Sequence, residues 1–210
     1  MGPLAIDNKQ RKVQLDEETS KQTYLKSSFV IWLTGLPSSG KTTIAGLLKP
    51  KLKQHGLYAE QLDGDVVRRD LSPDLGFTKR DRDIHARRVV YLCKLLCRNG
   101  VPTIVSLISP YRDFRSFARN EIGSFVEVHV KCSLGTCIQR DVKGLYKKAL
   151  NGEINDLTGL QDPYEEPLNP EIVVNTELET LDNVTDKIIW KLNELGYIKY
   201  PKYTDSVMQI

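Results

Sequence analysis

The segment from Gly35 to Thr42 constrains the fold of this chain more than any other part of its sequence. It reads Gly-Leu-Pro-Ser-Ser-Gly-Lys-Thr and fits the pattern G-x-x-x-x-G-K-[ST]. An apolar, β-branched run, Phe29–Thr34, precedes it, and a stretch of helical period, Thr42–His55, follows it. A strand, a glycine-rich turn and a helix in this order predict a loop whose backbone N–H groups surround a phosphate group.

The residue types in this loop suit the binding of ATP together with Mg²⁺. Glycine permits the tight backbone angles that bring successive N–H groups onto one phosphate, and the start of a helix favours an anion. We expect Lys41 to bridge the β- and γ-phosphates and Thr42 to offer its hydroxyl to the metal. The residues expected to bind ATP here are Gly35, Leu36, Pro37, Ser38, Ser39, Gly40, Lys41, Thr42 and Thr43. The alternative, a glycine-rich turn with an incidental lysine, is disfavoured by the flanking strand and helix.

Elsewhere in the chain, short apolar runs alternate with longer segments of helical period. This alternation is typical of an α/β fold, in which helices cover a parallel sheet. The predicted strands are Phe29–Thr34, Leu57–Leu62, Pro102–Ile108, Phe125–Val130 and Glu171–Asn175. The predicted helices are Thr42–His55, Arg80–Asn99, Arg112–Ile122, Leu134–Asp141 and Leu181–Leu195. We therefore expect a five-stranded parallel sheet flanked by helices.

The length of 210 residues suits one domain, which we place at residues 28–198. Residues 1–27 are polar without a sustained apolar period, so we interpret them as an arm with one short helix near Asp16–Lys26, and residues 199–210 as a tail. Residues 143–170 are rich in Lys, Asp, Glu, Gly and Pro. A loop of this length indicates a lid that covers an active site, and the alternative is a plain surface loop.

Charge and hydropathy exclude several classes of protein. Thirty basic and twenty-seven acidic residues leave a net charge of +3, too small to indicate a nucleic-acid or membrane-surface partner. The longest apolar runs, such as Val101–Ile108, fall short of the roughly 20 residues that span a bilayer. The polar N-terminus lacks the features of a secretory signal, so we expect a cytoplasmic protein.

Four cysteines raise the question of a metal site, because Cys93 and Cys97 lie one helical turn apart. Neither this pair nor Cys132 and Cys137 has the two-residue spacing of a zinc knuckle. Their neighbours are apolar, and buried free thiols are common in reducing compartments. The sequence favours core thiols over a zinc site.

Two carboxylates follow the second predicted strand, at the sheet edge where ligands of open α/β folds bind. Asp63 could hold a metal-bound water or accept the proton of an acceptor hydroxyl, and Asp65 stands close by. Either residue could instead cap a helix. An arginine cluster comes next, and guanidinium groups at this edge favour an anionic acceptor over a merely solvated helix face. Its members are Arg68, Arg69, Arg80, Arg82, Arg87 and Arg88.

Taken together, these segments resemble the adenylyl-sulfate kinase family of P-loop NTPase fold, over about Phe29 to Thr176. Besides the phosphate loop, the similar blocks are Leu62–Arg68, Asp74–Phe77 with Asp81 and Arg82, Ser106–Arg112, Lys143–Ala149, Asp162–Glu165 and Asn169–Glu171. The resemblance implies transfer of the γ-phosphoryl group of ATP to the 3′-hydroxyl of adenosine 5′-phosphosulfate (APS). It also implies a homodimer.

The resemblance assigns further site residues. Arg68 and Arg82 would hold the phosphosulfate, and Phe77 would stack on the adenine of APS. Ile108 and Ser109 would line the acceptor pocket. Lys143 would reach the phosphates from the lid, and Arg140 would contact ATP. The serine at position 109 is sometimes nominated as a phosphoserine intermediate in such families, but we expect direct in-line transfer, because no activating base is identifiable nearby.

Two departures from the family pattern lie on the acceptor side. His85 stands where the family has an asparagine expected to hydrogen-bond the nucleotide, and Leu157 stands where it has an aromatic ring expected to sandwich the adenine against Phe77. An imidazole can still hydrogen-bond and a leucine can still pack on a base. Two alternatives stay open: a related kinase with a different nucleotide-like acceptor, and a nucleotide-binding regulatory module without catalysis.

Overall fold

The computed structural model describes residues 28–199 of the chain. The predicted arm of residues 1–27, its short helix at Asp16–Lys26, and the predicted tail from residue 200 onward lie outside the described residues. Within the described range, none of the helices has the length and apolar character needed to cross a membrane.

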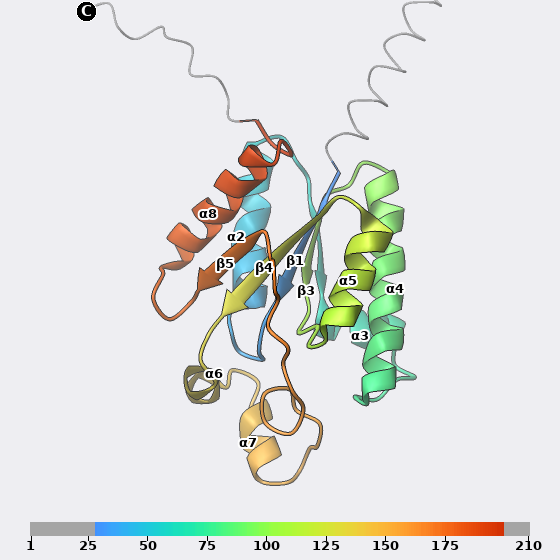
Figure 1. The fold of residues 1–210 in the computed structure, drawn as a ribbon, viewed down its shortest axis with the longest axis vertical. Helices are drawn as coiled ribbons and strands as arrows, with labels where there is room; N and C mark the ends of the chain where they lie inside the picture. Colours follow the sequence, from blue (N-terminus) through green and yellow to red (C-terminus); the bar gives the residue numbers. More distant parts are fainter. Residues whose placement is uncertain (1–27, 200–210) are drawn as a thin grey trace, which may run out of the picture.

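Five parallel strands form one sheet at the centre of the fold (Figure 1). They are β1 (Val30–Thr34), β2 (Glu60–Asp63), β3 (Thr103–Ser106), β4 (Phe125–Lys131) and β5 (Ile172–Asn175), in the spatial order β2-β3-β1-β4-β5. The predicted parallel sheet is thereby confirmed. Because all strands run the same way, their carboxyl ends meet at one edge, the edge that faces α6 and α7 in Figure 1.

Helices cover both faces of the sheet. On one face lie α2 (Lys41–Gln54) and α8 (Leu181–Glu194), and on the other α3 (Gly64–Leu71), α4 (Lys79–Arg98) and α5 (Arg112–Ile122) (Figure 1). Two short helices, α6 (Leu134–Arg140) and α7 (Leu145–Leu150), lie beyond the carboxyl edge. The sequence did not predict α3 or α7.

Strand alternation divides the apolar side chains between two cores. In β1, Ile31 and Leu33 belong to the cluster shared with α2 and α8, whereas Trp32 belongs to the cluster shared with α4 and α5. Successive side chains of a strand point to opposite faces, so a strand covered on both sides is apolar throughout. All five residues of β1 are buried. This double cover fixes the position of the phosphate loop, which follows β1.

The lid region has an apolar core of its own, which the sequence did not predict. Cys132, Cys137, Tyr146 and Leu157 are buried there together. Tyr146 is fully buried, and its hydroxyl donates a hydrogen bond to the carbonyl oxygen of Pro37 at 3.1 Å. The lid is therefore packed onto the phosphate loop at its base.

The four cysteines are free thiols in apolar surroundings, as predicted. Cys93 is a fully buried residue of α4, and Cys97 packs against the same cluster. Burial raises the pKa of the Cys97 thiol to about 11, so it stays protonated at neutral pH. Across residues 28–199, no group of three or more His, Cys, Asp or Glu side chains is arranged to hold a metal ion.

Candidate active site

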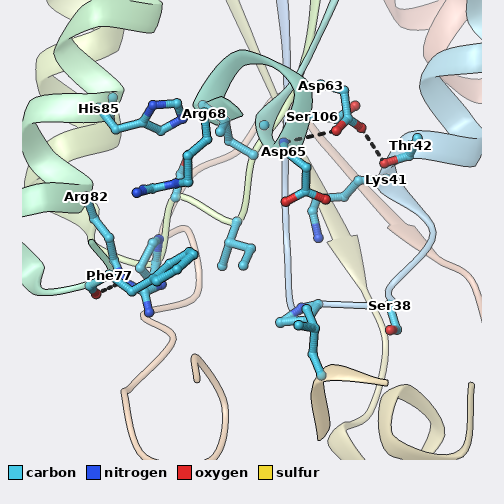
Figure 2. Close-up of a pocket in the computed structure, with 18 of the residues that line it drawn as sticks. Ser38, Lys41, Thr42, Asp63, Asp65, Arg68, Phe77, Arg82, His85 and Ser106 are labelled. Atoms are coloured by element: carbon cyan, nitrogen blue, oxygen red, sulfur yellow. Dashed lines mark hydrogen bonds between the residues drawn. The ribbon is translucent and has the colours of Figure 1, made fainter. Parts of the chain in front are cut away.

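A cavity of about 1020 Å³ opens at the carboxyl edge of the sheet. The phosphate loop and the start of α2 form one wall, and α3 with the first turns of α4 forms the other (Figure 2). Asp63 and Asp65 lie between the two walls. The cavity thus joins the predicted ATP side and the predicted acceptor side in one space, as the strand order requires.

Glycine is required at the first position of the phosphate loop. Gly35 has φ 156°, and a β-carbon there would lie 2.5 Å from the carbonyl oxygen of Val130. Gly40, with φ 97°, is the N-cap of α2 and has no side chain to cap the helix. The first turn of α2 contains no acidic residue, so its free N–H groups are suited to bind an anion.

Lys41 lies folded onto the phosphate loop. Its ammonium group donates to the carbonyl oxygens of Gly35 at 2.9 Å and Leu36 at 2.6 Å, and to Ser39 Oγ at 3.3 Å. Its side chain is buried, and this burial lowers the pKa of Lys41 to about 8, with a further contribution from Lys143. A cation held in the loop is placed to neutralise phosphate oxygens there.

Thr42 and Asp63 meet between α2 and the sheet. Thr42 Oγ1 donates to Asp63 Oδ2 at 2.7 Å, and the backbone N–H of Asp65 donates to Asp63 Oδ1 at 3.0 Å (Figure 2). The second bond makes Asp63 the N-cap of α3. The capping alternative for Asp63 is therefore correct, yet its other oxygen contacts the threonine expected to bind the metal.

Two basic residues of the α6–α7 region lie at the rim of the cavity. Lys143 forms an ion pair with Asp65, and both side chains are more than half exposed. Arg140 donates to Thr176 Oγ1 at 3.0 Å and to the Thr176 carbonyl oxygen at 2.7 Å. Thr176 Oγ1 in turn donates to the carbonyl oxygen of Ser39, which connects Arg140 to the phosphate loop. Thr43 also lines this side.

The two predicted anion-binding arginines lie on the opposite wall. Arg68 stacks on the ring of Phe77 at 4.7 Å and donates to the Gly76 carbonyl oxygen at 2.5 Å. Burial, followed by repulsion from Arg82, lowers the pKa of Arg68. The Phe77 ring is 58% exposed, which leaves a face open to the cavity.

Arg82 connects α4 to the lid. Its Nε donates to the Phe77 carbonyl oxygen at 2.7 Å, and its Nη1 donates to Thr158 Oγ1 at 2.8 Å. Nη2 contacts the carbonyl oxygen of Asp156 and lies 3.4 Å from Asp162 Oδ2. The lid segment around Thr158 is thereby held against the acceptor wall.

His85 lies beside Arg68, and its side chain is almost fully buried (Figure 2). Nδ1 is 3.0 Å from Ser72 Oγ, whereas Nε2 has no hydrogen-bond partner among the described residues. Burial, followed by repulsion from Arg68 and Arg88, lowers the pKa of His85 to about 4. A neutral imidazole at this wall can donate or accept one hydrogen bond with a ligand.

Ile108 and Ser109 line the cavity beyond the end of β3. Ser109 has φ 45°, its Oγ accepts a hydrogen bond from Trp32 Nε1 at 3.1 Å, and its carbonyl oxygen accepts one from Arg115 at 2.5 Å. An indole N–H only donates, so Trp32 cannot take the hydroxyl proton of Ser109. This contact favours a positioning role for Ser109 over a nucleophilic one.

Leu157, which we expect to pack on the adenine opposite Phe77, lies in the lid core, and its contact with a bound nucleotide stays a prediction. Leu157 is 7% exposed, packs in the lid core with Tyr146 and does not line the cavity. The physical reason is burial, because a leucine gains more from contact with an apolar cluster than from an open, polar cavity.

Sequence reasoning did not single out three polar residues of the site. Thr176 supports Arg140, Ser72 contacts His85, and Ser106 lines the cavity at the end of β3. Ser106 is the last residue of β3 and Thr176 directly follows β5. Thr176 also follows the predicted strand Glu171–Asn175, a position that could have marked it, whereas Ser106 lies inside the predicted strand Pro102–Ile108. No sequence signal marked Ser72, because its contact with α4 depends on helix packing.

A model of the family described as adenylylsulphate kinase matches residues 27–175. The match includes the phosphate loop, Asp63, the two arginines and the lid. This chain belongs to the adenylyl-sulfate kinase family. Among the relatives of this family member, the adenylyl-sulfate kinase of Rippkaea orientalis is 56% identical over 171 residues, which cover 81% of this chain and 94% of the relative. The adenylyl-sulfate kinase of Halothermothrix orenii is 49% identical over 172 residues, which cover 82% of this chain and 93% of the relative.

A solved structure of an adenylyl-sulfate kinase family member is similar in fold. The Mycobacterium tuberculosis APS kinase CysC, in complex with AMPPNP and APS, superimposes with a TM-score of 0.77 at 37% identity, covering 80% of this chain and 98% of that one. This similarity agrees with the parallel sheet flanked by helices.

Proposed function

We propose that this chain transfers the γ-phosphoryl group of ATP to the 3′-hydroxyl of APS, giving 3′-phosphoadenosine 5′-phosphosulfate and ADP. The observation that carries the proposal is a single cavity with a phosphate loop on one wall and paired arginines on the other. Family membership and the similarity to a kinase solved with AMPPNP, an ATP analogue, and APS support it. The chain is then a phosphotransferase with an alcohol acceptor.

The residues around Thr42 fit a magnesium ion. A hydroxyl and a carboxylate, Thr42 Oγ1 and Asp63 Oδ2, lie 2.7 Å apart beside the phosphate loop. Hard oxygen ligands of this kind suit Mg²⁺, which is usually held by one or two protein oxygens, waters and substrate phosphates. When bound, the ion would neutralise charge on the β- and γ-phosphates.

The chain's own residues would position and stabilise the transfer. Lys41 would leave its loop carbonyls for phosphate oxygens, and Asp63 would orient the acceptor hydroxyl or accept its proton. Arg68 and Arg82 would bind the phosphosulfate by charge-assisted hydrogen bonds. Phe77 would stack on the adenine, and Ile108 with Ser109 would line the ribose side.

Lid residues would complete the site. Lys143 would exchange its ion pair with Asp65 for contacts with phosphate, and Arg140 would contact the bound ATP from the α6 side. His85 would hydrogen-bond the acceptor through Nε2. Closure of the lid would exclude water, which otherwise competes for the phosphoryl group.

The direct test measures ADP formation by the purified protein with ATP, Mg²⁺ and a panel of nucleotide acceptors. We expect turnover with APS and much less with adenosine 5′-monophosphate, which lacks the sulfate. Turnover with another acceptor but not APS would instead favour the second candidate, a kinase with a different acceptor. The departure from the family pattern at His85 is the observation that keeps this candidate open.

A non-catalytic regulatory module is the third candidate, and the phosphate-loop lysine tests it. We expect Lys41→Ala to lower kcat/KM by at least about a hundredfold, because the ammonium group that would neutralise the transferring phosphoryl group is lost. A parallel Lys49→Ala variant, on the exposed side of α2, controls for the loss of a lysine from this helix. Unchanged activity in Lys41→Ala would rule out the proposed mechanism.

We further propose a homodimer in the cytoplasm. The family resemblance supports the dimer, although a related structure is described as a hexameric APS kinase from Thiobacillus denitrificans. The four free cysteines suit a reducing compartment. Light scattering during size-exclusion chromatography would distinguish a dimer from a monomer or a hexamer.

A further inference from the structure

One hydroxyl in the cavity has no role in the proposed function so far. Ser106 is the last residue of β3 and lines the cavity, and its side chain is 5% exposed. Its Oγ has no hydrogen-bond partner among residues 28–199. Buried hydroxyls normally have a partner, so an unpaired one at the edge of a ligand cavity points to a group that arrives with the ligand.

Strand alternation decides which wall of the cavity Ser106 faces. In β3, Ile104 packs in the core shared with α2 and α8, and Val105 packs in the core shared with α4 and α5. The next side chain, Ser106, therefore points to the α2 side. This is the side of the phosphate loop, opposite to the wall that carries Arg68 and His85.

Asp63 points to the same side from the neighbouring strand. Leu62 packs against the α4 and α5 core, so Asp63 faces α2, where Thr42 bonds to it. Asp63 and Ser106 are direct register partners of the parallel pair β2 and β3. Neighbouring strands lie about 4.8 Å apart, so the two side chains are close, yet Ser106 Oγ makes no hydrogen bond to Asp63. A water between the two groups could bond to both.

We propose that Ser106 is a positioning residue for the magnesium ion of the nucleotide complex. Its Oγ hydrogen-bonds a metal-bound water that Asp63 also holds. The inference rests on the proposed function for the identity of the metal site, namely Thr42 and Asp63. Mg²⁺ retains several of its waters in proteins, and the groups that orient such waters tune affinity for the ion.

The competing explanation is that position 106 needs a small residue for packing and makes no use of the hydroxyl. A β-carbon on Gly64 would lie 3.1 Å from the Ser106 carbonyl oxygen, so the backbone is crowded here. That crowding concerns the main chain and would tolerate alanine as well as serine. Ser106→Ala keeps the size and removes only the hydroxyl, so it separates the two explanations.

The test is calorimetric titration of the full chain with ADP, with and without Mg²⁺. For Ser106→Ala we expect ADP affinity to fall about three- to tenfold when Mg²⁺ is present and to stay unchanged when the metal is chelated. The control is Thr103→Val, which removes a buried hydroxyl from the other end of the same strand. It should leave both affinities unchanged.

A second matched pair keeps the proposal testable if the alanine variant folds poorly. Ser106→Thr retains a hydroxyl and should keep the wild-type dependence of ADP affinity on Mg²⁺. Ser106→Val introduces a side chain of the same shape as threonine without the hydroxyl, and it should reduce that dependence. Equal weakening with and without metal, or an unchanged response to metal, would overturn the proposal. So would a Ser106→Ala effect confined to the KM of the acceptor.

Because the readout uses ADP and Mg²⁺ alone, it does not depend on turnover. If APS is not phosphorylated but the Ser106 variants change the response to magnesium, the acceptor assignment fails and the inference stands. If APS is phosphorylated and the variants leave that response unchanged, only the inference fails.

Discussion

Arg115 of α5 and Glu127 of β4 form a buried ion pair, with Nε and Oε1 2.8 Å apart. The same guanidinium donates to the carbonyl oxygens of Ser109 at 2.5 Å and Glu165 at 2.6 Å. One side chain thus joins the helix, the sheet, the acceptor loop and the end of the lid. It fixes the backbone of Ser109, which has a positive φ.

Removing Arg115 should therefore destabilise the fold strongly. We expect Arg115→Met to lower the free energy of unfolding by about 3–5 kcal/mol, because buried Glu127 would keep only its longer pair with Arg119, at 3.2 Å, and the Ser109 carbonyl oxygen would lose this donor. Denaturant unfolding measures the change. The control is Lys94→Ala, which breaks an exposed pair with Glu121 and should cost at most about 1 kcal/mol. Similar losses of unfolding free energy in the two variants would show that the buried pair stabilises the fold no more than the exposed pair does.

The hydrogen bond between Tyr146 and Pro37 should matter for ATP binding as well as for stability. Tyr146→Phe keeps the ring in the lid core but leaves the Pro37 carbonyl oxygen without this donor. We expect the free energy of unfolding to fall by about 1–3 kcal/mol. We also expect the KM for ATP to rise over its wild-type value by a larger factor than the KM for APS. Equal changes in both KM values would show that the bond does not act through the phosphate loop.

Lys41 should make nucleotide binding sensitive to alkaline pH. Its pKa in the folded protein is about 8, so above that pH the empty site holds a neutral amine, which binds phosphate poorly. We expect ADP affinity to fall as pH rises from 7.5 to 9.5, by up to about tenfold per unit above the pKa. Calorimetry at constant ionic strength measures this, and a flat profile would contradict it.

The same shift predicts the opposite trend for the stability of the free protein. The unfolded lysine keeps its proton up to about pH 10.5, whereas the folded one releases it near pH 8. The unfolded state then binds more protons between these values, so stability rises with pH across that window. We expect the Tm of wild type relative to Lys41→Met to rise from pH 8 to pH 10. A Tm difference that stays constant with pH would argue against a buried Lys41 with a lowered pKa.

His85 should contribute to acid destabilisation. Its pKa of about 4 in the folded protein lies below the ordinary value of 6.5, so the unfolded state binds more protons between these values. Stability is therefore lost as pH falls from 6.5 towards 4, by about 2 kcal/mol at pH 5. His129, whose pKa is also lowered by burial, adds to the trend.

The variant His85→Asn, which does not titrate, measures this contribution. We expect its Tm to fall less between pH 7 and pH 5 than that of wild type. An identical fall in the two proteins would show that His85 is not held neutral by the fold. The same variant introduces the asparagine that the family resemblance implies at this position, and it should retain APS turnover.

The strands and long helices followed from the sequence to within a few residues. β4 was predicted as Phe125–Val130 and spans Phe125–Lys131, because Val126, Val128 and Val130 recur at the two-residue period of a strand. β2 was predicted to start at Leu57 but starts at Glu60, since its polar composition gives no clear boundary. The short helices α3 and α7 were missed because six to eight residues carry too little periodicity.

Within the site, the parts that follow one another in the chain were readable from sequence. The phosphate loop and Asp63 are examples, since a local motif and a strand end determine their placement. The burial of Leu157 in the lid core was not predicted, because it depends on Tyr146 and Cys137 from other segments. Ser72 and Ser106 were not recognised, because each acquires its surroundings only when helices and strands pack.

The sequence by itself determined the chemistry of the site: a loop that binds phosphate, an acidic strand end and a group of arginines. These are local patterns, in which residue type and spacing carry the physical meaning. Only the tertiary structure decided which groups face each other across the cavity, such as Asp63 beside Ser106 and Arg82 against Thr158. Those pairings join distant segments, so they are set by strand order and packing rather than by any neighbouring residue.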